Sequence, residues 1–470
     1  MPNSFATFAL CAWPIVAICL FATQSLTRAI LWTLMGAQLV LPVGAYFKFE
    51  MIPQFDKFSI PNLCVLLGCL VLGRRRLRIF SNFGLAELLV SGLLVGPIIT
   101  SLLNGDPVQI GAEVRPGVGL YDALSFAENS FIFMIPFFIG RQYLSKSEDI
   151  RDTMFILVIA GLVYSLPLLY EIRMSPTLQA QIYGFSATDF VMTARWGGYR
   201  PMVFMGHGLI ASFFAMTTAV AAAALWRTRL RSFQFFPAAG LTAYLSAILV
   251  LCKSFGALLY GAVLVPLLRW TSPRVHMRVA VVLVSISLLY PALRSFDLFP
   301  THVLAETVAM ISEERALSLE FRFVNEDKLL RHAFQRPLFG WGRYGRNRVY
   351  SEQNGQDASV TDGMWIITVG QFGILGFVAQ FGLLALGVFR AASASRHLRG
   401  PLQDTIFLSA LALIVSANLI ELIPNATLLP WTWLLSGALL GRAEALKRQL
   451  ARDPAQMKLT RIGSPVAARA

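Results

Sequence analysis

The chain has 470 residues, of which 56% are hydrophobic and 14% are charged, and its formal net charge is +14. This composition leaves too little polar surface for a soluble globule of this length, which excludes an ordinary soluble enzyme or binding domain. It predicts an all-α polytopic membrane helix bundle, because backbone groups in lipid must be satisfied within helices.

Apolar runs long enough to cross about 30 Å of hydrocarbon recur along almost the whole chain. We predict twelve or thirteen transmembrane helices, ten of them in residues 1–294 and the rest in residues 362–445. Their predicted centres are Ala12, Leu39, Leu67, Leu94, Phe133, Val163, Phe214, Ile248, Leu264, Ser287, Gln380, Leu413 and Leu435. The runs around Leu67 and Leu435 are the weakest, and the count depends on them.

Clusters of Lys and Arg follow every second predicted span, and such clusters stay on the cytoplasmic side of a membrane. They lie within residues 74–78, 141–151, 227–231, 269–278, 390–399 and 442–448. The pattern predicts an external N-terminus, a cytoplasmic tail at residues 446–470, and external loops at 104–121, 173–200 and 295–361. Because most of the net charge lies in the cytoplasmic loops, we expect anionic lipid headgroups as its partners and no nucleic acid.

The segment of residues 295–361 is the largest predicted external loop. Between Ala305 and Phe334, apolar residues alternate with acids and Arg, which predicts one or two short amphipathic helices over the membrane mouth. Residues 336–348 read RPLFGWGRYGRNR, in which the glycines permit a tight turn and the guanidinium groups suit phosphate oxygens. The alternative is a solvated basic loop whose Arg residues pair with the acids upstream.

Three polar positions lie within predicted spans. Glu128 and Asn129 are expected to face the bundle interior or water, either in a substrate path or in an interhelix bond. Glu421, near the outer end of the twelfth span, is expected to face an external cavity. The five cysteines have no metal-ligand or disulfide spacing, and the sequence has no Walker loop or haem motif, so we predict no metal site and no cofactor.

The C-terminal two-thirds of the chain resembles the O-antigen ligase and Wzy-type polymerase superfamily of bacterial polysaccharide assembly. The resemblance lies in the order of segments: a large external loop with Pro-Leu-Phe-Gly-x-Gly, then a polar residue opening a helix that carries Gly-x-x-Gly. Here Asp362 and Gly363 are followed by nine residues and then by Gly373 and Gly376, which also indicate close helix packing. In the ligase branch of the family, His and Asn stand where this chain has Asp362 and Gly363.

Two further segments are similar to segments of the family. GGYRPMVFMGHG at residues 197–208 resembles its Arg-bearing entry into a middle span, and CKSFGALL at residues 252–259 resembles its Ser-plus-basic turn. The resemblance implies a metal-independent glycosyltransferase of the bacterial inner membrane that uses a polyprenyl-diphosphate-linked glycan as donor. It implies a glycan or lipid-glycan acceptor and, as a further partner, a polysaccharide-export complex. The missing His favours a polymerase over a ligase.

In the implied reaction the lipid diphosphate leaves as an anion. We therefore expect cations in the site that stabilise its negative charge. We expect Arg200 and Arg343 to act in catalysis with Asp362, which would take the acceptor proton or orient its hydroxyl. The residues expected to contact substrate are Arg346, Lys253, Arg115, Glu421, His207, Trp341 and Tyr344.

Several of these assignments have structural alternatives. Asp362 alternatively caps the helix that starts beside it, and His207, expected about one turn inside its span, takes the role of base if Asp362 has none. Trp341 and Tyr344 alternatively lie at the membrane interface.

Two other functions fit the same architecture: a lipid-linked sugar transporter or flippase, and a non-catalytic component of polysaccharide secretion. A transferase should gather Asp362 and at least two of the named Arg around one external cavity. A transporter should line a path through the bundle past Glu128.

Overall fold

The computed structural model describes residues 2–49, 52–72, 84–110, 113–186, 190–195, 197–229, 236–310, 312–351, 353, 355–396 and 402–452. The basic cluster at residues 74–78, Arg231, Arg399 and most of the predicted tail, residues 453–470, lie outside the described residues.

The described residues form sixteen α-helices, and each of the thirteen predicted span centres lies inside one of them. The helices that contain these centres are α1 (Ser4–Thr23), α2 (Leu26–Val40), α3 (Ser59–Leu72), α4 (Leu85–Leu102), α5 (Leu120–Tyr143), α6 (Ser147–Met174), α8 (Gly208–Thr228), α9 (Ala238–Leu251), α10 (Phe255–Trp270), α11 (Pro273–Ser295), α14 (Met364–Ser395), α15 (Leu402–Glu421) and α16 (Pro430–Arg452). Eight of them are long and apolar enough to cross a membrane, and α2, α3, α9 and α10 are shorter apolar helices. The predicted all-α polytopic membrane bundle is confirmed.

The strands are short and lie in the connections between helices. Each pairs with its neighbour as a two-stranded antiparallel hairpin. The pairs are β1 (Tyr46–Phe47) with β2 (Phe55–Asp56), β3 (Val108–Ile110) with β4 (Glu113–Arg115), and β5 (Ala194–Arg195) with β6 (Gly198–Tyr199). A short helix α7 (Leu178–Tyr183) and a 3-10 turn (Phe190–Thr193) precede β5.

Small residues allow the closest helix contact, between α5 and α16. A Cβ at Gly437 would collide with the carbonyl of Phe137, and one at Gly441 with the carbonyl of Arg141. In lipid, burial of apolar surface does little to bring helices together. Glycines that let two helix backbones approach closely therefore favour helix packing. At the end of this pair, Arg141 bonds to Glu87 at 2.8 Å and to Glu444 at 2.9 Å, so Glu444 of α16 is paired within the bundle.

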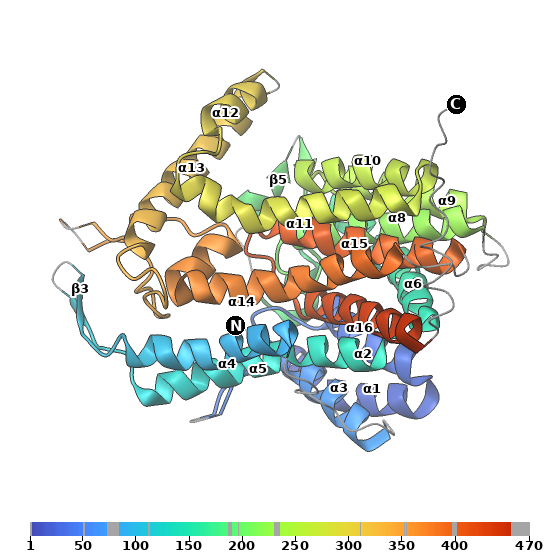
Figure 1. Ribbon diagram of the computed structural model, residues 1–470, viewed down its shortest axis with the longest axis horizontal. Helices are drawn as coiled ribbons and strands as arrows, with labels where there is room; N and C mark the ends of the chain where they lie inside the picture. Colours follow the sequence, from blue (N-terminus) through green and yellow to red (C-terminus); the bar gives the residue numbers. More distant parts are fainter. Residues whose placement is uncertain are drawn as a thin grey trace, which may run out of the picture.

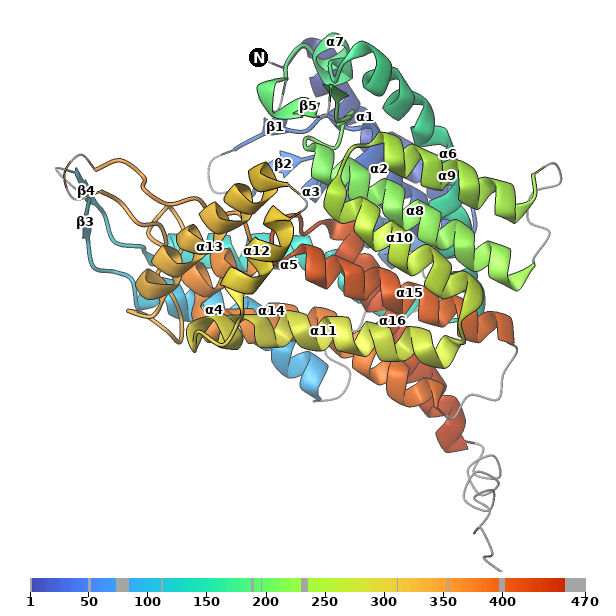
Figure 2. The same ribbon diagram turned by 90° about the horizontal axis from the view of Figure 1, so that it is seen from above.

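Two helices fill much of the segment predicted as the large loop: α12 (Thr301–Ala309) and α13 (Glu313–Ala333). They lie at one end of the bundle, the same end as the β3–β4 hairpin, and we call it the α13 end (Figures 1 and 2). Helix α13 is held to α11 by Arg294, which bonds to Asp327 at 2.6 Å, and to α14 by Glu326, which accepts from Trp365 at 3.2 Å.

Helix α14 is interrupted at Gly373, whose φ of 67° and ψ of −168° are not helical. The turn predicted at residues 336–348 inserts into this interruption. Trp341 N donates to the carbonyl of Gly370 at 2.9 Å, and Ile374 N donates to the carbonyl of Pro337 at 2.8 Å. The interpretation of Gly373 as a helix-packing glycine is therefore wrong: it breaks the helix so that the turn satisfies the backbone groups on both sides.

Candidate functional site

The loop from Arg200 to His207 is held in place by buried side chains of other elements. Both Met202 N and Val203 N donate to one carboxylate oxygen of Glu171 on α6, at 2.8 and 2.7 Å. The Nζ of Lys57 donates to the carbonyls of Phe204 and Leu41. Burial lowers the pKa of Lys57 to about 7. Fixed backbone positions of this kind orient the side chains at the two ends of the loop.

Arg200 is at the centre of a cationic cluster, which we define as Arg195, Arg200, Lys253 and Arg315. Arg200 is only 7% exposed. Burial, together with the positive charges of Arg195 and Arg315, lowers its pKa to about 10. Lys253 Nζ lies 3.3 Å from the carbonyl of Arg195. The buried Nε atoms of Arg195 and Arg200 have no hydrogen-bond partner among the described residues, so the cluster has unused donors for an anion.

His207 borders the cationic cluster at the start of α8. It is the N-cap residue of that helix rather than a residue one turn inside it, so the predicted depth is wrong. Its Nδ1 accepts a hydrogen bond from Leu209 N at 3.1 Å. Burial and the charges of Arg200 and Arg195 lower its pKa, which keeps the imidazole neutral at pH 7.

Asp362 forms an ion pair with Arg322 of α13, with 3.4 Å between Oδ2 and Nε. Arg322 also donates to the carbonyl of Pro424 at 3.2 Å. The N-cap of α14 is Gly363, and no side chain caps the helix, so Asp362 does not have the alternative capping role. Arg322 and Arg315 are seven residues apart on α13, which puts both on one helix face. That face links the cationic cluster to Asp362.

Glu421 lies on the same side of the bundle. Its buried carboxylate accepts from Asn425 at 2.8 Å, bonds to Tyr260 and has Arg322 as a charged neighbour. Glu421 was predicted to face an external cavity; its carboxylate is instead buried, and it shares the neighbour Arg322 with Asp362.

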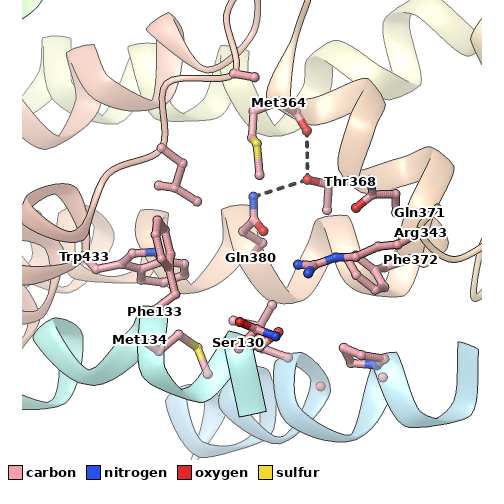
Figure 3. Close-up of a pocket in the computed structure, with 18 residues that line it drawn as sticks. Ser130, Phe133, Met134, Arg343, Met364, Thr368, Gln371, Phe372, Gln380 and Trp433 are labelled. Atoms are coloured by element: carbon pink, nitrogen blue, oxygen red, sulfur yellow. Dashed lines mark hydrogen bonds between the residues drawn. The ribbon is translucent and has the colours of Figure 1, made fainter. Parts of the chain in front are cut away.

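Arg343 lies elsewhere, at a cavity of about 400 Å³ between α4, α5 and α14 (Figure 3). Its guanidinium lies 5.0 Å from the ring of Phe126 and 5.8 Å from that of Phe372. It forms no hydrogen bond or ion pair within the described part of the chain. Burial lowers its pKa, yet a guanidinium remains charged in proteins. The result is a cation without an acid, pointing into a cavity.

The cavity wall carries amide and hydroxyl groups beside apolar ones. Asn129 and Ser130 contribute from α5, and Thr368, Gln371 and Gln380 from α14. Glu128, by contrast, is exposed and does not line this cavity. Of the two placements predicted for Glu128, the bundle interior does not apply, because α5 turns Asn129 inward instead.

Two of the predicted cations hold loops together. Arg346 bonds to the carbonyl of Asp106 at 2.9 Å and pairs with its carboxylate at 3.4 Å. Arg115 donates to the carbonyl of Tyr344 at 2.7 Å and to Tyr350 at 3.0 Å. Arg346 thus has an acidic partner, as the alternative expected, but this acid lies in another loop rather than in residues 305–334, and Arg346 is buried rather than solvated.

The two predicted aromatic contacts differ. Trp341 stacks on His332 at 4.5 Å and lies under Arg336 at 4.3 Å, so its ring packs against protein. Tyr344 is 59% exposed and donates to Asp122 at 2.9 Å. Its ring is therefore accessible at the surface.

The predicted residues therefore divide between separate places. Asp362 and Glu421 share the neighbour Arg322, Arg200 and Lys253 belong to the cationic cluster that His207 borders, and Arg343 lies at the separate cavity. Among the described residues, Asp362 therefore pairs with Arg322 and not with two of the named Arg, as was expected of a transferase. Within the described residues, no group of three or more His, Cys, Asp or Glu side chains could hold a metal ion. No protein-family model matches this chain, and a comparison with curated proteins finds no significant match.

Three cations and one acid were missed by the sequence analysis: Arg195, Arg315, Arg322 and Glu171. The seven-residue spacing of Arg315 and Arg322 was a readable signal of one helix face. Nothing in the sequence linked Glu171 to a loop thirty residues later, because its bonds go to backbone groups.

Proposed function

We propose that this protein is a membrane glycosyltransferase of the O-antigen ligase and polymerase type. It would move a glycan from a polyprenyl-diphosphate carrier to an acceptor hydroxyl at the external face of the bacterial inner membrane, during exopolysaccharide or O-antigen assembly. One observation carries the proposal: α13 carries both Arg315, whose charge acts on the buried guanidinium of Arg200, and Arg322, which pairs with the carboxylate of Asp362. Diphosphate binding and proton acceptance need these two groups side by side.

The reaction balances without a metal ion or nucleotide. The acceptor oxygen attacks the anomeric carbon and forms a new C–O bond, while the bond from that carbon to the diphosphate oxygen breaks. The electron pair of the broken bond leaves on the polyprenyl diphosphate, whose charge Arg200, Arg195 and Arg322 stabilise. The proton of the acceptor hydroxyl passes to Asp362 and from there to water.

Polymerisation is favoured over ligation within this proposal. Asp362 stands where the ligase branch carries His, and a polymerase uses lipid-linked glycans as both donor and acceptor. The distinction appears in the products: glycan chains lengthened on the carrier indicate a polymerase, and glycan moved to a different lipid indicates a ligase.

The test is a reconstitution of purified protein in liposomes with a labelled polyprenyl-diphosphate-linked repeat unit. Free polyprenyl diphosphate and glycan length are measured together. We expect Asp362→Asn and Arg200→Gln to lower carrier release about 100-fold or more. Arg331→Gln, an exposed Arg on the same α13 helix, is the matched control and should retain full activity.

Two outcomes would contradict the proposal. Wild-type protein that moves the intact lipid-linked glycan across the membrane without releasing carrier would be a flippase. Full activity in both Asp362→Asn and Arg200→Gln would remove the site from the mechanism.

A further inference from the structure

The Arg343 cavity and the Asp362 site lie on opposite sides of the same two short segments. We call these segments, residues 362–364 and 424–428, the shared wall. Asp362 and the carbonyl of Pro424 contact Arg322 on one side. Met364, Ala426 and Leu428 line the cavity on the other side. Ligands in the two places would be separated only by these two short segments.

The cavity is polar at one end and apolar at the other. Arg343 and Gln371 lie at one end of the cavity, and Phe133 and Trp433 lie at the other (Figure 3). Both parts of α14 line the cavity, because the break at Gly373 brings Gln380 back against Thr368, whose Oγ1 accepts from Gln380 Nε2 at 3.2 Å. A ligand that matches this distribution has an anionic headgroup and an apolar chain. The volume of about 400 Å³ is within the range of small-ligand sites.

The charge at the polar end favours an anionic partner. Arg343 is half-buried beside two aromatic rings, and a partly desolvated guanidinium without an acid is stabilised when an anion completes its contacts. Arg346 and Arg348, from the same turn, have carboxylates of their own in Asp106 and Asp357. Arg343 has none within the described residues. Among the cations of this turn, it is the one left for a ligand.

We propose that the Arg343 cavity is a second site for a lipid-borne phosphate group, separate from the Arg200 and Arg322 site. Its occupant is the diphosphate end of the acceptor glycan's carrier, with the first carbons of the lipid chain against Phe133 and Trp433. The identity of the occupant as acceptor rests on the proposed function; the binding of a lipid phosphate does not. Two carriers side by side would bring the acceptor sugar to Asp362 over the shared wall.

Gly96 of α4 gives a direct way to fill the cavity. A Cβ built on Gly96 meets no atom within 4 Å, and Gly96 lines the cavity. Gly96→Leu therefore extends from an unobstructed Cβ into the space of a ligand. Gly240→Leu makes the same change at a helical glycine on α9, where an added Cβ makes only ordinary contacts, and serves as the matched control.

The experiment counts bound undecaprenyl diphosphate by native mass spectrometry of the detergent-solubilised full chain. We expect two carriers per wild-type or Gly240→Leu chain and one per Gly96→Leu or Arg343→Gln chain, with the second binding weakened about tenfold or more. Arg200→Gln combined with Arg322→Gln should remove the other carrier and leave the cavity occupied. If Gly96→Leu does not fold, Arg343→Gln decides the question.

Competition identifies the source of the phosphate. Phosphatidylglycerol that displaces the second carrier at equal concentration would make the cavity a phospholipid site and contradict the acceptor assignment. Inorganic pyrophosphate that competes as well as the lipid would show that the apolar end contributes nothing, which contradicts a lipid ligand. One carrier on wild type, or two on both Gly96→Leu and Arg343→Gln, would overturn the second site.

Binding and transfer separate the two proposals. Two bound carriers without glycan transfer would keep the second site and contradict the proposed function. Glycan transfer by a chain that binds only one carrier would support the proposed function and contradict the second site.

Discussion

Arg322 of α13 and Asp362, two residues before α14, form an ion pair with 3.4 Å between Nε and Oδ2. Their side chains are 32% and 40% exposed, so water screens the pair. Screened pairs contribute about 0 to 1 kcal/mol to stability. The pair therefore matters less for the fold than for holding a carboxylate beside an excess of guanidinium groups.

The first prediction concerns Arg322. Arg322→Gln should change the free energy of unfolding by less than about 1 kcal/mol, yet lower carrier release about 100-fold or more, because it removes a cation from the leaving group. Thermal unfolding in detergent and the liposome assay measure the two effects. The double variant Arg322→Asp with Asp362→Arg restores an ion pair and should remain inactive; recovered activity would mean that the pair has only a structural role.

The second prediction concerns Glu171, which anchors the Arg200 loop. Glu171→Ala leaves the amides of Met202 and Val203 buried without an acceptor. We expect a loss of about 3 kcal/mol in unfolding free energy, since each unsatisfied buried donor costs about 1 to 3 kcal/mol. Carrier binding at the Arg200 site should weaken in parallel.

Glu148→Ala is the control for this variant, because Glu148 is an exposed acid at the other end of α6. It should cost less than about 1 kcal/mol. Equal stability loss in the two variants would show that the bonds of Glu171 to the loop are unimportant.

The third prediction separates two glycines. Gly373→Ala forces a side chain into a φ of 67° and against the backbone of Leu338. It should cost about 2 kcal/mol or more and release the 336–348 turn from α14. Gly96→Ala, at a helical position with open space, should instead stabilise the protein by about 0.5 to 1 kcal/mol.

Thermal unfolding and limited proteolysis of the turn measure these changes. A Gly373→Ala chain with wild-type stability and an intact turn would contradict the role assigned to the break in α14.

The fourth prediction is a pH dependence set by Lys57, whose pKa burial lowers to about 7 from an ordinary value of 10.5. Between these values the unfolded chain binds the proton more tightly than the folded chain. Unfolding free energy should therefore rise with pH from about 7 to 10, by up to about 1.4 kcal/mol per pH unit from this group alone. Below pH 7 both states are protonated and the contribution levels off.

Lys57→Met removes the titrating group, so the difference in slope between wild type and variant isolates its effect. Equal slopes over this pH range would mean that Lys57 is protonated in the folded protein. The variant also leaves the carbonyl of Phe204 without its Lys57 bond, which should lower stability at every pH.

The sequence by itself determined the membrane class and the positions of the helices. All thirteen predicted centres lie in helices because a run's apolar length and its need to satisfy backbone groups in lipid are local properties. The Arg and Gly content of residues 336–348 likewise pointed to a cation-bearing turn.

Tertiary structure alone decided which of those cations are available. Arg346 pairs with Asp106, 240 residues earlier, while Arg343 faces a cavity without an acid. Asp362 meets Arg322, which the sequence analysis did not single out. The reason is physical: ion pairing and burial depend on distances through space between distant segments, and helix periodicity records only the neighbours along one helix.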